Sequence, residues 1–278
     1  MRFPIFTFCL LTIATVMGNP AASAQATDDF AATLTDVGGT VFVQIASAGE
    51  WIPAETGIPI AENDEIMTES DSFADILIDD GSLVRVAENT HISVSELAFN
   101  EETREVKTSI FLQVGKLLSN ITAFLHKDSY YDVRTPTAVA GVRGTEFMVD
   151  ATDALQTEVG VFDGRVSVGN LDKNGVLVPD STVYVPRGKQ TMVARLKRPR
   201  RPFAHTAKMT TYQKRFSRLR KKAIENKKNL TKIKLKRLSR KKSFLQNWKR
   251  RKPALPGKPK TKLPVKKLPK KPKKRPRP

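Results

Sequence analysis

The fold of this chain is decided by the stretch Thr135–Phe147, which reads TPTAVAGVRGTEF. It is too apolar for a surface loop, yet it contains a proline, two glycines and one arginine. Pro136 favours an extended backbone before it and cannot donate a ladder hydrogen bond, which suits a strand start or edge. Gly141 and Gly144 allow a positive φ or the close approach of another backbone. Arg143 is costly to bury unless it meets a carboxylate or carbonyl oxygens. The stretch therefore predicts a turn that shapes a β core and holds one polar contact inside it.

Alternation of apolar and polar residues with a period of two predicts β-strands on both sides of this stretch. It is clearest at Gly39–Gln44, Phe73–Ile78 and Ser82–Val86. Further strands are expected at His91–Leu97, Glu105–Val114, Tyr131–Val133, Thr145–Asp150, Gln156–Phe162, Val166–Val168, Thr182–Val185 and Gln190–Ala194. Many short strands with frequent turns predict one all-β domain over residues 34–194, with a sandwich, barrel or roll-like architecture.

Two segments of this domain leave alternatives open. Asp80 and Gly81 tolerate a positive φ, and together with Asp79 they predict a hairpin turn between two strands. A calcium site would need a third ligand at loop spacing, which the sequence lacks, so the turn is favoured. The segment Phe111–Ile121 is either the end of a strand or a brief helix, because its apolar residues recur at helical spacing.

The stretch Thr135–Phe147 resembles the signature of the FecR family, Thr-Pro-x-Ala-x-x-Gly-x-Arg-Gly-Thr-x-Phe. The matching residues are Thr135, Pro136, Ala138, Gly141, Arg143, Gly144, Thr145 and Phe147. The earlier half of the family pattern is similar at Gly57, Asn63, Asp64, Ile66, Thr68, Ser72, Ala74, Ile76, Asp80, Gly81, Ser82 and Thr90. The resemblance covers roughly Leu34 to Val193. It implies a periplasmic sensor domain of iron-uptake signalling, which responds to an outer-membrane receptor and controls a sigma factor, or an exported protein with another role.

The N-terminus has the order of segments that a secretory signal requires. Arg2 precedes the apolar run Phe3–Met17, and Ala22-Ser23-Ala24 provides a small-residue cleavage site. We expect cleavage after Ala24 and a periplasmic or secreted protein; an uncleaved anchor is the alternative, although the run is short for a span of ~20 residues. Cys9, the only cysteine, would leave with residues 1–24, so no thiolate metal site is expected. Residues 25–33 are expected to be a linker.

The charge divides the chain into two parts. From Arg195 to Pro278, 36 Lys and Arg face the single acid Glu225, which gives this tail a formal charge of +35. The remaining 12 basic residues face 27 acids, so the rest of the chain carries −15 and the total is +20. The two parts should attract each other at low salt, and the tail should seek anionic partners.

The tail itself has two predicted parts, residues 195–251 and 252–278. Lys208–Trp248 could form a helix whose apolar side carries Tyr212, Phe216, Leu219, Ala223, Leu230 and Ile233. Like charges four residues apart oppose this helix in water, so we expect it to fray until an anionic surface neutralises them. From Lys252 on, prolines alternate with lysines, which predicts an extended disordered segment. The candidate binding residues of the tail are Arg215, Arg218, Lys221, Lys222, Lys241, Arg250, Lys267 and Lys274.

The searches for catalytic and cofactor motifs favour a protein that is not an enzyme and has no cofactor. His91, His126 and His205 are scattered, and none has a second histidine or a cysteine three or four residues away, which argues against zinc. No serine lies in a nucleophile-elbow pattern. The glycines at Gly38-Gly39 and Gly141–Gly144 are wrongly arranged for a phosphate-binding loop.

Three functions remain. The first is an exported FecR-type module whose tail attaches it to anionic envelope polymers or to a membrane surface, where Tyr212, Phe216, Leu219 and Trp248 could insert. The second is nucleic-acid binding by counterion release; export and the scarcity of aromatic residues in the tail argue against it. The third is the sensor role of the family. Direct sigma-factor control is not expected, since no domain precedes the export signal and no spanning helix follows it. A protein partner for the β domain stays open.

Overall fold

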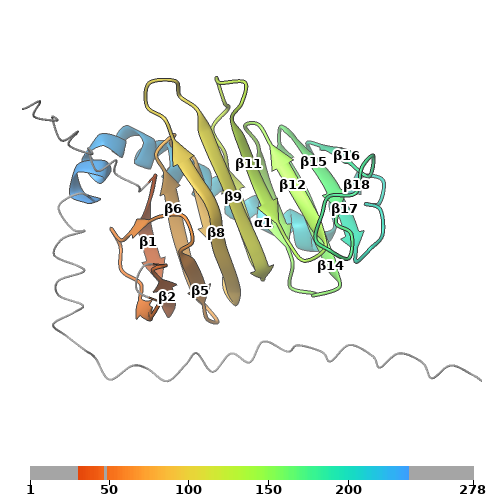
Figure 1. Ribbon diagram of the computed structural model, residues 1–278, viewed down its shortest axis with the longest axis horizontal. Coiled ribbons are helices and arrows are strands. Elements are labelled where there is room, and N and C mark those ends of the chain that lie inside the picture. Colours follow the sequence, from red (N-terminus) through yellow and green to blue (C-terminus); the bar gives the residue numbers. More distant parts are fainter. Residues whose placement is uncertain (1–30, 47–48, 238–278) are drawn as a thin grey trace, which may run out of the picture.

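The computed structural model describes residues 31–46 and 49–237, and it confirms an all-β domain followed by a helical segment. The strands form two nine-stranded sheets (Figure 1). Sheet A has the order β18 (Phe203–Ala204), β17 (Lys189–Ala194), β14 (Gln156–Asp163), β13 (Glu146–Asp150), β10 (Lys116–Asn120), β7 (Leu83–Val86), β6 (Phe73–Ile78), β1 (Ala32–Gly38), β4 (Pro59–Ile60). Sheet B has the order β16 (Val183–Pro186), β15 (Arg165–Asn170), β12 (Ala138–Val142), β11 (Tyr130–Arg134), β9 (Val106–Val114), β8 (Thr90–Phe99), β5 (Glu65–Thr68), β2 (Val41–Gln44), β3 (Trp51–Pro53).

The chain builds both sheets together as it advances along the molecule. Each of several hairpins stays within one sheet: β6 and β7 pair in sheet A, β8 and β9 in sheet B, and β11 and β12 again in sheet B. The chain changes sheet between these hairpins. Neighbouring strands pair antiparallel, with the exception of β9 and β11, which are parallel because the single strand β10 lies between them in sequence and in the other sheet. The architecture is a sandwich, one of the predicted possibilities.

The main core lies between the two sheets. It contains side chains from nearly every strand, including Leu34, Ile66, Leu112 and Phe147, which are fully buried. Tyr131 joins them, and its ring meets Phe147 edge-on at a centroid distance of 6.1 Å. Burial of such large side chains supplies most of the stability of a domain of this kind.

The two sheets differ in how their outer faces are covered. Strands of sheet B alternate between buried and accessible residues, as in β2 and β12, whereas β13 is buried at all five positions and β6 at five of six. Alternation is typical of a sheet with one solvated face, and continuous burial requires a cover on both faces. The cover of sheet A is the helix α1 (Ala207–Lys228), which lies behind the sheets in Figure 1. The chain is again helical over residues 230–237.

The signature stretch forms a turn, a strand and a second turn. Thr135 and Ala138 close the first turn: the Thr135 nitrogen donates to the Ala138 oxygen at 2.8 Å, and the Ala138 nitrogen donates to the Thr135 hydroxyl at 2.9 Å. The buried hydroxyls of Thr135 and Thr137 both bond to the Thr157 hydroxyl, at 2.8 and 2.7 Å. Pro136 lies in this turn, where no strand ladder needs its missing donor. The stretch therefore joins the strand pair β11–β12 to β14 of the other sheet.

The two glycines of the signature meet different demands. Gly144 has a φ of +88°, and a Cβ there would lie 2.5 Å from the Ala123 Cα. Gly141 lies inside β12 without a positive φ, and a Cβ there would come within 3.1 Å of the Ser167 hydroxyl. Thr145 follows the turn and donates from its hydroxyl to the Arg165 oxygen at 3.0 Å. Only glycine satisfies both the backbone conformation and the space at position 144.

Arg143 does not form the internal polar contact that the sequence suggests. Its side chain is exposed, and its guanidinium donates to the backbone oxygens of His126 and Lys127, at 3.2 and 2.8 Å. The carbonyl partners agree with the expectation, but burial was wrong, because β12 directs position 143 to the solvated face of sheet B.

Replacing Arg143 with alanine is therefore expected to lower the free energy of unfolding by less than about 1 kcal/mol, since exposed hydrogen bonds contribute little. Denaturant unfolding of wild type and Arg143→Ala measures the difference. A loss above about 3 kcal/mol would indicate a buried, paired guanidinium and contradict this arrangement.

Other sequence predictions can be compared with the strands directly. Asp79, Asp80 and Gly81 form the predicted turn between β6 and β7, with a φ of +92° at Gly81. The helix alternative for Phe111–Ile121 was wrong. Phe111 to Val114 form the end of β9, and the strand β10 follows at Lys116–Asn120. Gly115, with a φ of +104°, lies between the two strands. The strands extend beyond the expected limits 34 and 194, from β1 at Ala32 to β18 at Ala204.

Candidate functional site

The outer face of sheet A is a strip of apolar side chains that α1 covers. Leu77, Leu83, Leu118, Met148 and Phe162 project from five strands of the sheet. Facing them are the buried residues of the helix, Met209, Phe216, Leu219 and Ala223, with Tyr212, Leu230 and Ile233 packed at the margin. The spacing of these residues is the apolar stripe predicted from the sequence. The stripe therefore packs on the protein itself, and Phe216 and Leu219, which were expected to insert if the anionic surface is a membrane, are buried against sheet A here.

Basic residues on the flanks of the stripe pair with carboxylates of the β domain. Lys222 pairs with Asp36 and, at 3.1 Å, with Asp75, while Lys208 pairs with Asp150 at 2.7 Å. The pairs continue along α1 and the helical residues 230–237. They join Arg220 to Glu146, Lys208 to Glu158, Lys234 to Glu101 and Arg237 to Asp79. The anionic surface that the helix was expected to require is thus supplied by its own β domain.

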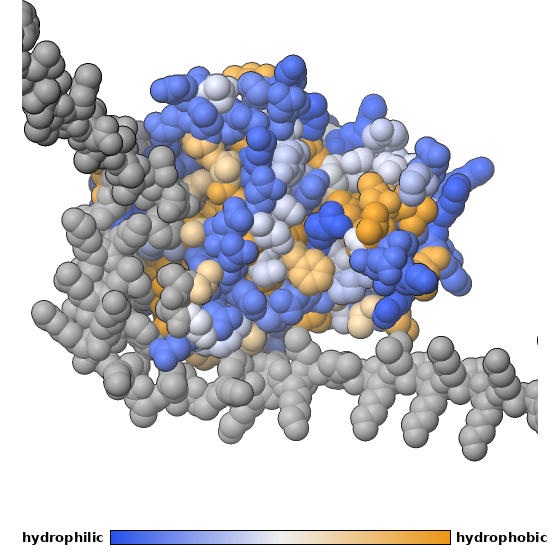
Figure 2. All heavy atoms as spheres, viewed as in Figure 1, coloured by the Kyte–Doolittle hydropathy of each residue, from blue (hydrophilic) through white to orange (hydrophobic). Residues whose placement is uncertain are grey.

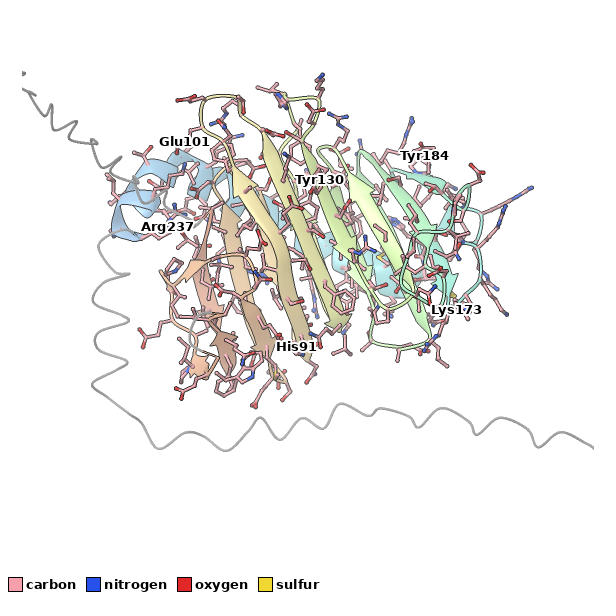
Figure 3. The ribbon with its side chains drawn as sticks, in the orientation of Figure 1. His91, Glu101, Tyr130, Lys173, Tyr184 and Arg237 are labelled. Atoms are coloured by element: carbon pink, nitrogen blue, oxygen red, sulfur yellow. The ribbon has the colours of Figure 1, made fainter. Side chains whose placement is uncertain are left out.

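The pair of Arg237 and Asp79, at the end of this row, is the most deeply buried of these ion pairs. Both nitrogens of the Arg237 fork donate to the Asp79 carboxylate, at 2.9 and 3.0 Å, and both side chains are less than 10% exposed. Lys234 bridges Asp79 and Glu101, at 3.3 and 2.6 Å. Figure 3 shows Arg237 and Glu101 at the same end of the sandwich. A bidentate, buried pair fixes orientation more strongly than an exposed one.

The start of α1 is fixed by hydrogen bonds to sheet A. Thr206 is the N-cap, and its hydroxyl accepts from the Met209 nitrogen at 3.4 Å. The buried Gln190 of β17 accepts from the Thr206 nitrogen at 2.8 Å. Gly160 of β14 leaves the space that the Met209 thioether fills. Lys227 and Lys228 in the last turn favour the helix by interacting with its dipole.

The ion pair of Lys208 and Asp150 shifts the pKa of both groups. Burial alone would raise the pKa of Asp150, but hydrogen bonds from Lys208 and Thr152 lower it below its usual value. Burial alone would lower the pKa of Lys208, but its hydrogen bond to Asp150 raises it. A carboxyl group whose pKa is depressed on folding stabilises the fold above its unfolded pKa and loses that effect as the pH falls through its folded pKa. The pair therefore holds α1 at neutral pH and weakens in acid.

The opposite side of the helical segment is basic and faces solvent. We call this the outward basic face; it comprises Lys214, Arg218, Lys221, Lys228 and Lys232, which are exposed. Among the described residues, none of these five side chains forms an ion pair. Their spacing of three, four and seven residues places them along one side of a helix. Glu225 is the single acid between Arg195 and Pro278.

The predicted binding residues of the tail therefore separate into groups. Arg218 and Lys221 belong to the outward basic face, whereas Lys222 points inward to Asp36 and Asp75. Arg215 lies over the Tyr212 ring, 5.4 Å from its centroid. Lys241, Arg250, Lys267 and Lys274 lie outside the described residues.

Sequence reasoning missed the carboxylates that receive the helix. Asp75, Glu146 and Asp150 lie in strands whose other residues are apolar, and their burial is a signal that a cationic partner is needed. The partners, Arg220, Lys208 and Lys222, are 58 to 147 residues away in sequence, and nothing local identifies them.

On the opposite side of the molecule, none of the elements that the structure describes covers the outer face of sheet B. Figure 2 shows it as a mixture of polar and apolar residues, with an apolar cluster at the end where β15 and β16 lie. The exposed apolar side chains near this end include Val176, Leu177 and Tyr184. Within the described ranges, no group of three His, Cys, Asp or Glu side chains could hold a metal ion. In that same part of the chain, no helix is long and apolar enough to cross a membrane.

Comparison with known proteins identifies the family of the β domain. The family model FecR protein matches residues 64–167, which include β5 to β14 and the signature stretch. Two crystal structures of a proposed anti-sigma factor from Parabacteroides distasonis ATCC 8503 align with this chain, at 20% and 19% identity and a TM-score of 0.40 each. Each alignment covers 53% of this chain and 62% of the other, so the chain spans less than two thirds of their length. No curated protein sequence matches. The family match confirms the resemblance seen in the signature: residues 64–167 match the FecR family.

Proposed function

We propose that this protein is an exported FecR-type binding module that attaches to anionic polymers of the cell envelope through its outward basic face and the basic residues that follow it. The observation that carries the proposal is the division of charge on the helical segment. On one side, the cations form ion pairs with carboxylates of sheet A. On the other side, five cations are exposed and have no ion-pair partner among the described residues.

The magnitude of this attraction is modest for the described residues alone. A basic residue near an anionic surface contributes about 1 kcal/mol, so the five residues together supply about 5 kcal/mol, a dissociation constant between 1 mM and 1 μM before ordering costs. Because α1 is already folded and docked, little ordering remains to oppose binding. The basic residues after position 237 would add to this by effective concentration.

The structure favours a polymer over an inserted membrane helix as the partner. Phe216 and Leu219, which would enter the apolar layer of a membrane, are instead enclosed against sheet A. A docked helix can still offer its basic side to phosphate or carboxylate groups. Attraction of this kind is electrostatic, and salt should weaken it.

Charge reversal on the outward basic face tests the proposal. We expect Arg218→Glu/Lys221→Glu/Lys228→Glu in the full chain to weaken binding to polyphosphate and to polygalacturonate by at least about tenfold at ~0.1 M salt, since each reversal replaces attraction with repulsion. Binding is measured by fluorescence anisotropy of labelled polymer across a salt series.

The matched control carries the same change of net charge elsewhere. Lys107→Glu/Lys173→Glu/Arg187→Glu reverses three cations of the β domain, and Figure 3 shows Lys173 away from Arg237, at the other end of the molecule. This control should lose much less affinity. Equal losses in both triple variants would mean that only net charge matters, and unchanged binding in the first variant would contradict the proposal.

A second candidate is a signalling-related role in the periplasm. The match to the FecR family model favours it, since members of that family are mostly periplasmic sensor domains. This candidate requires a protein partner for the β domain. A cross-linked envelope protein that remains bound at ~0.5 M salt, where the polymer attachment is screened, would favour the sensor role.

A further inference from the structure

A cleft of about 350 Å³ opens where α1 crosses the edge of the apolar strip on sheet A. Its floor is formed by β6, β7 and β10, through Phe73, Arg85 and Lys116, and its wall by α1, through Tyr212 and Arg215. The volume is at the lower end of the range for small-molecule sites. The cleft lies on the inward side of the helix and is therefore separate from the outward basic face.

Two cations in the cleft have no carboxylate partner among the described residues. The Lys116 nitrogen lies 5.8 Å from the centroid of the Tyr212 ring, and the Arg215 guanidinium carbon lies 5.4 Å from it. The ring attracts both cations and holds them beside the same cavity. No described carboxylate lies within ion-pair distance of either cation, so an anion that reaches both would neutralise them.

The third cation of the cleft is already fixed. Arg85 forms a bidentate pair with Asp75, at 2.6 and 2.8 Å, and stacks over the Phe73 ring at 4.4 Å. Arg85 is therefore held in a fixed position in the floor of the cleft. Pre-organised donors of this kind favour carboxylate and phosphate groups.

Two carboxylates also line the cleft. Glu88 and Asp71 line it, and the Glu88 carboxylate accepts from the Asp71 nitrogen at 3.4 Å. An apolar group placed against these carboxylates would strip them of water without compensation. Hydroxyl groups of a ligand would instead donate to them.

We infer that this cleft binds an acidic sugar, with its charged group between Lys116 and Arg215 and its hydroxyls toward Glu88 and Asp71. The charge can be a carboxylate or a phosphate, because both suit the same pair of cations. This site does not depend on attachment through the outward basic face. A ligand that spans β10 and α1 would also strengthen the contact between the helix and the β domain.

The test uses the full chain and four soluble probes: glucuronic acid, glucose 6-phosphate, inorganic phosphate and neutral glucose. We expect isothermal titration calorimetry to show saturable binding of the two sugar acids. Affinity for glucose should be at least about tenfold lower, because the loss of one charge-assisted hydrogen bond reduces affinity by about this factor. Lys116→Gln should reduce affinity for the acids about tenfold or more. Because Lys116 lies in β10, this loss cannot come from a change in the basic tail.

Lys107→Gln is the matched control, since it removes one lysine from sheet B outside the cleft, and it should bind the acids as wild type does. Arg218→Glu/Lys221→Glu/Lys228→Glu should also retain the sugar acids even when polymer binding is lost, which separates this inference from the proposed function. Equal affinity for inorganic phosphate and the sugar phosphate would overturn the role of the hydroxyl-binding end. Absence of saturable binding, or equal losses in Lys116→Gln and Lys107→Gln, would overturn the site.

Discussion

Gly144→Ala is expected to lower the free energy of unfolding by about 3–5 kcal/mol. Two costs add at this position: an alanine at a φ of +88° is strained, and its Cβ would lie 2.5 Å from the backbone Cα of Ala123. A flexible side chain could rotate away from such a contact, but a backbone atom cannot. Denaturant unfolding followed by circular dichroism measures the loss.

Gly175→Ala separates these two costs. Gly175 has a similar φ of +79°, but a Cβ there would meet nothing within 4 Å. It should therefore lose only the backbone term, about 1–2 kcal/mol. If both variants lost the same amount, the close approach of Ala123 would not be the reason for glycine in the signature.

The second large effect is expected where Arg237 joins the β domain. Asp79→Ala leaves a guanidinium that is 4% exposed without its bidentate carboxylate, and disruption of a buried pair typically costs about 3–5 kcal/mol. The full loss appears in global unfolding only if residues 230–237 unfold together with the sheets. Denaturant unfolding combined with hydrogen exchange of residues 230–237 distinguishes global loss from local release of this segment.

Asp163→Ala is the matched control for the exposed case. Asp163 pairs with Arg187 at 3.6 Å, and the two side chains are 55% and 76% exposed. The expected loss is less than about 1 kcal/mol, because solvent screens an exposed pair. Wild-type stability and wild-type exchange of residues 230–237 in Asp79→Ala would show that the buried pair does not hold this segment.

Local patterns in the sequence predict much of this fold. Alternation located β6 to the residue, and the apolar stripe located the inward side of α1. Short strands such as β3 and β4 carry too few residues for a period to appear, and β12 was hidden inside a stretch interpreted as a turn. The parallel pairing of β9 with β11 follows from which sheet β10 joins, and that choice is not a local property.

The candidate site was predictable in composition but not in place. The net charges of −15 and +35 imply attraction between the two parts of the chain, yet they do not say which acids meet which cations. Asp36, Asp75 and Glu146 become neighbours only through the strand order of sheet A. Arg143 was expected to make an internal contact because glycines on both sides suggest a close turn. Its exposure depends on the outer face of sheet B, which no described element covers, and this too is not a local property.

The cover on sheet A has a consequence for the order in which the protein can fold. Lys222 and Asp36, which meet across this cover, are 186 positions apart in the chain. During synthesis the strands are complete before residues 207–237 exist, so the apolar strip of Leu77, Leu118 and Phe162 has no partner for that interval. Contacts between distant parts of a chain form late, and exposed apolar surface is prone to aggregation until they do. A nascent or truncated chain that ends before α1 would therefore be the form most dependent on chaperones.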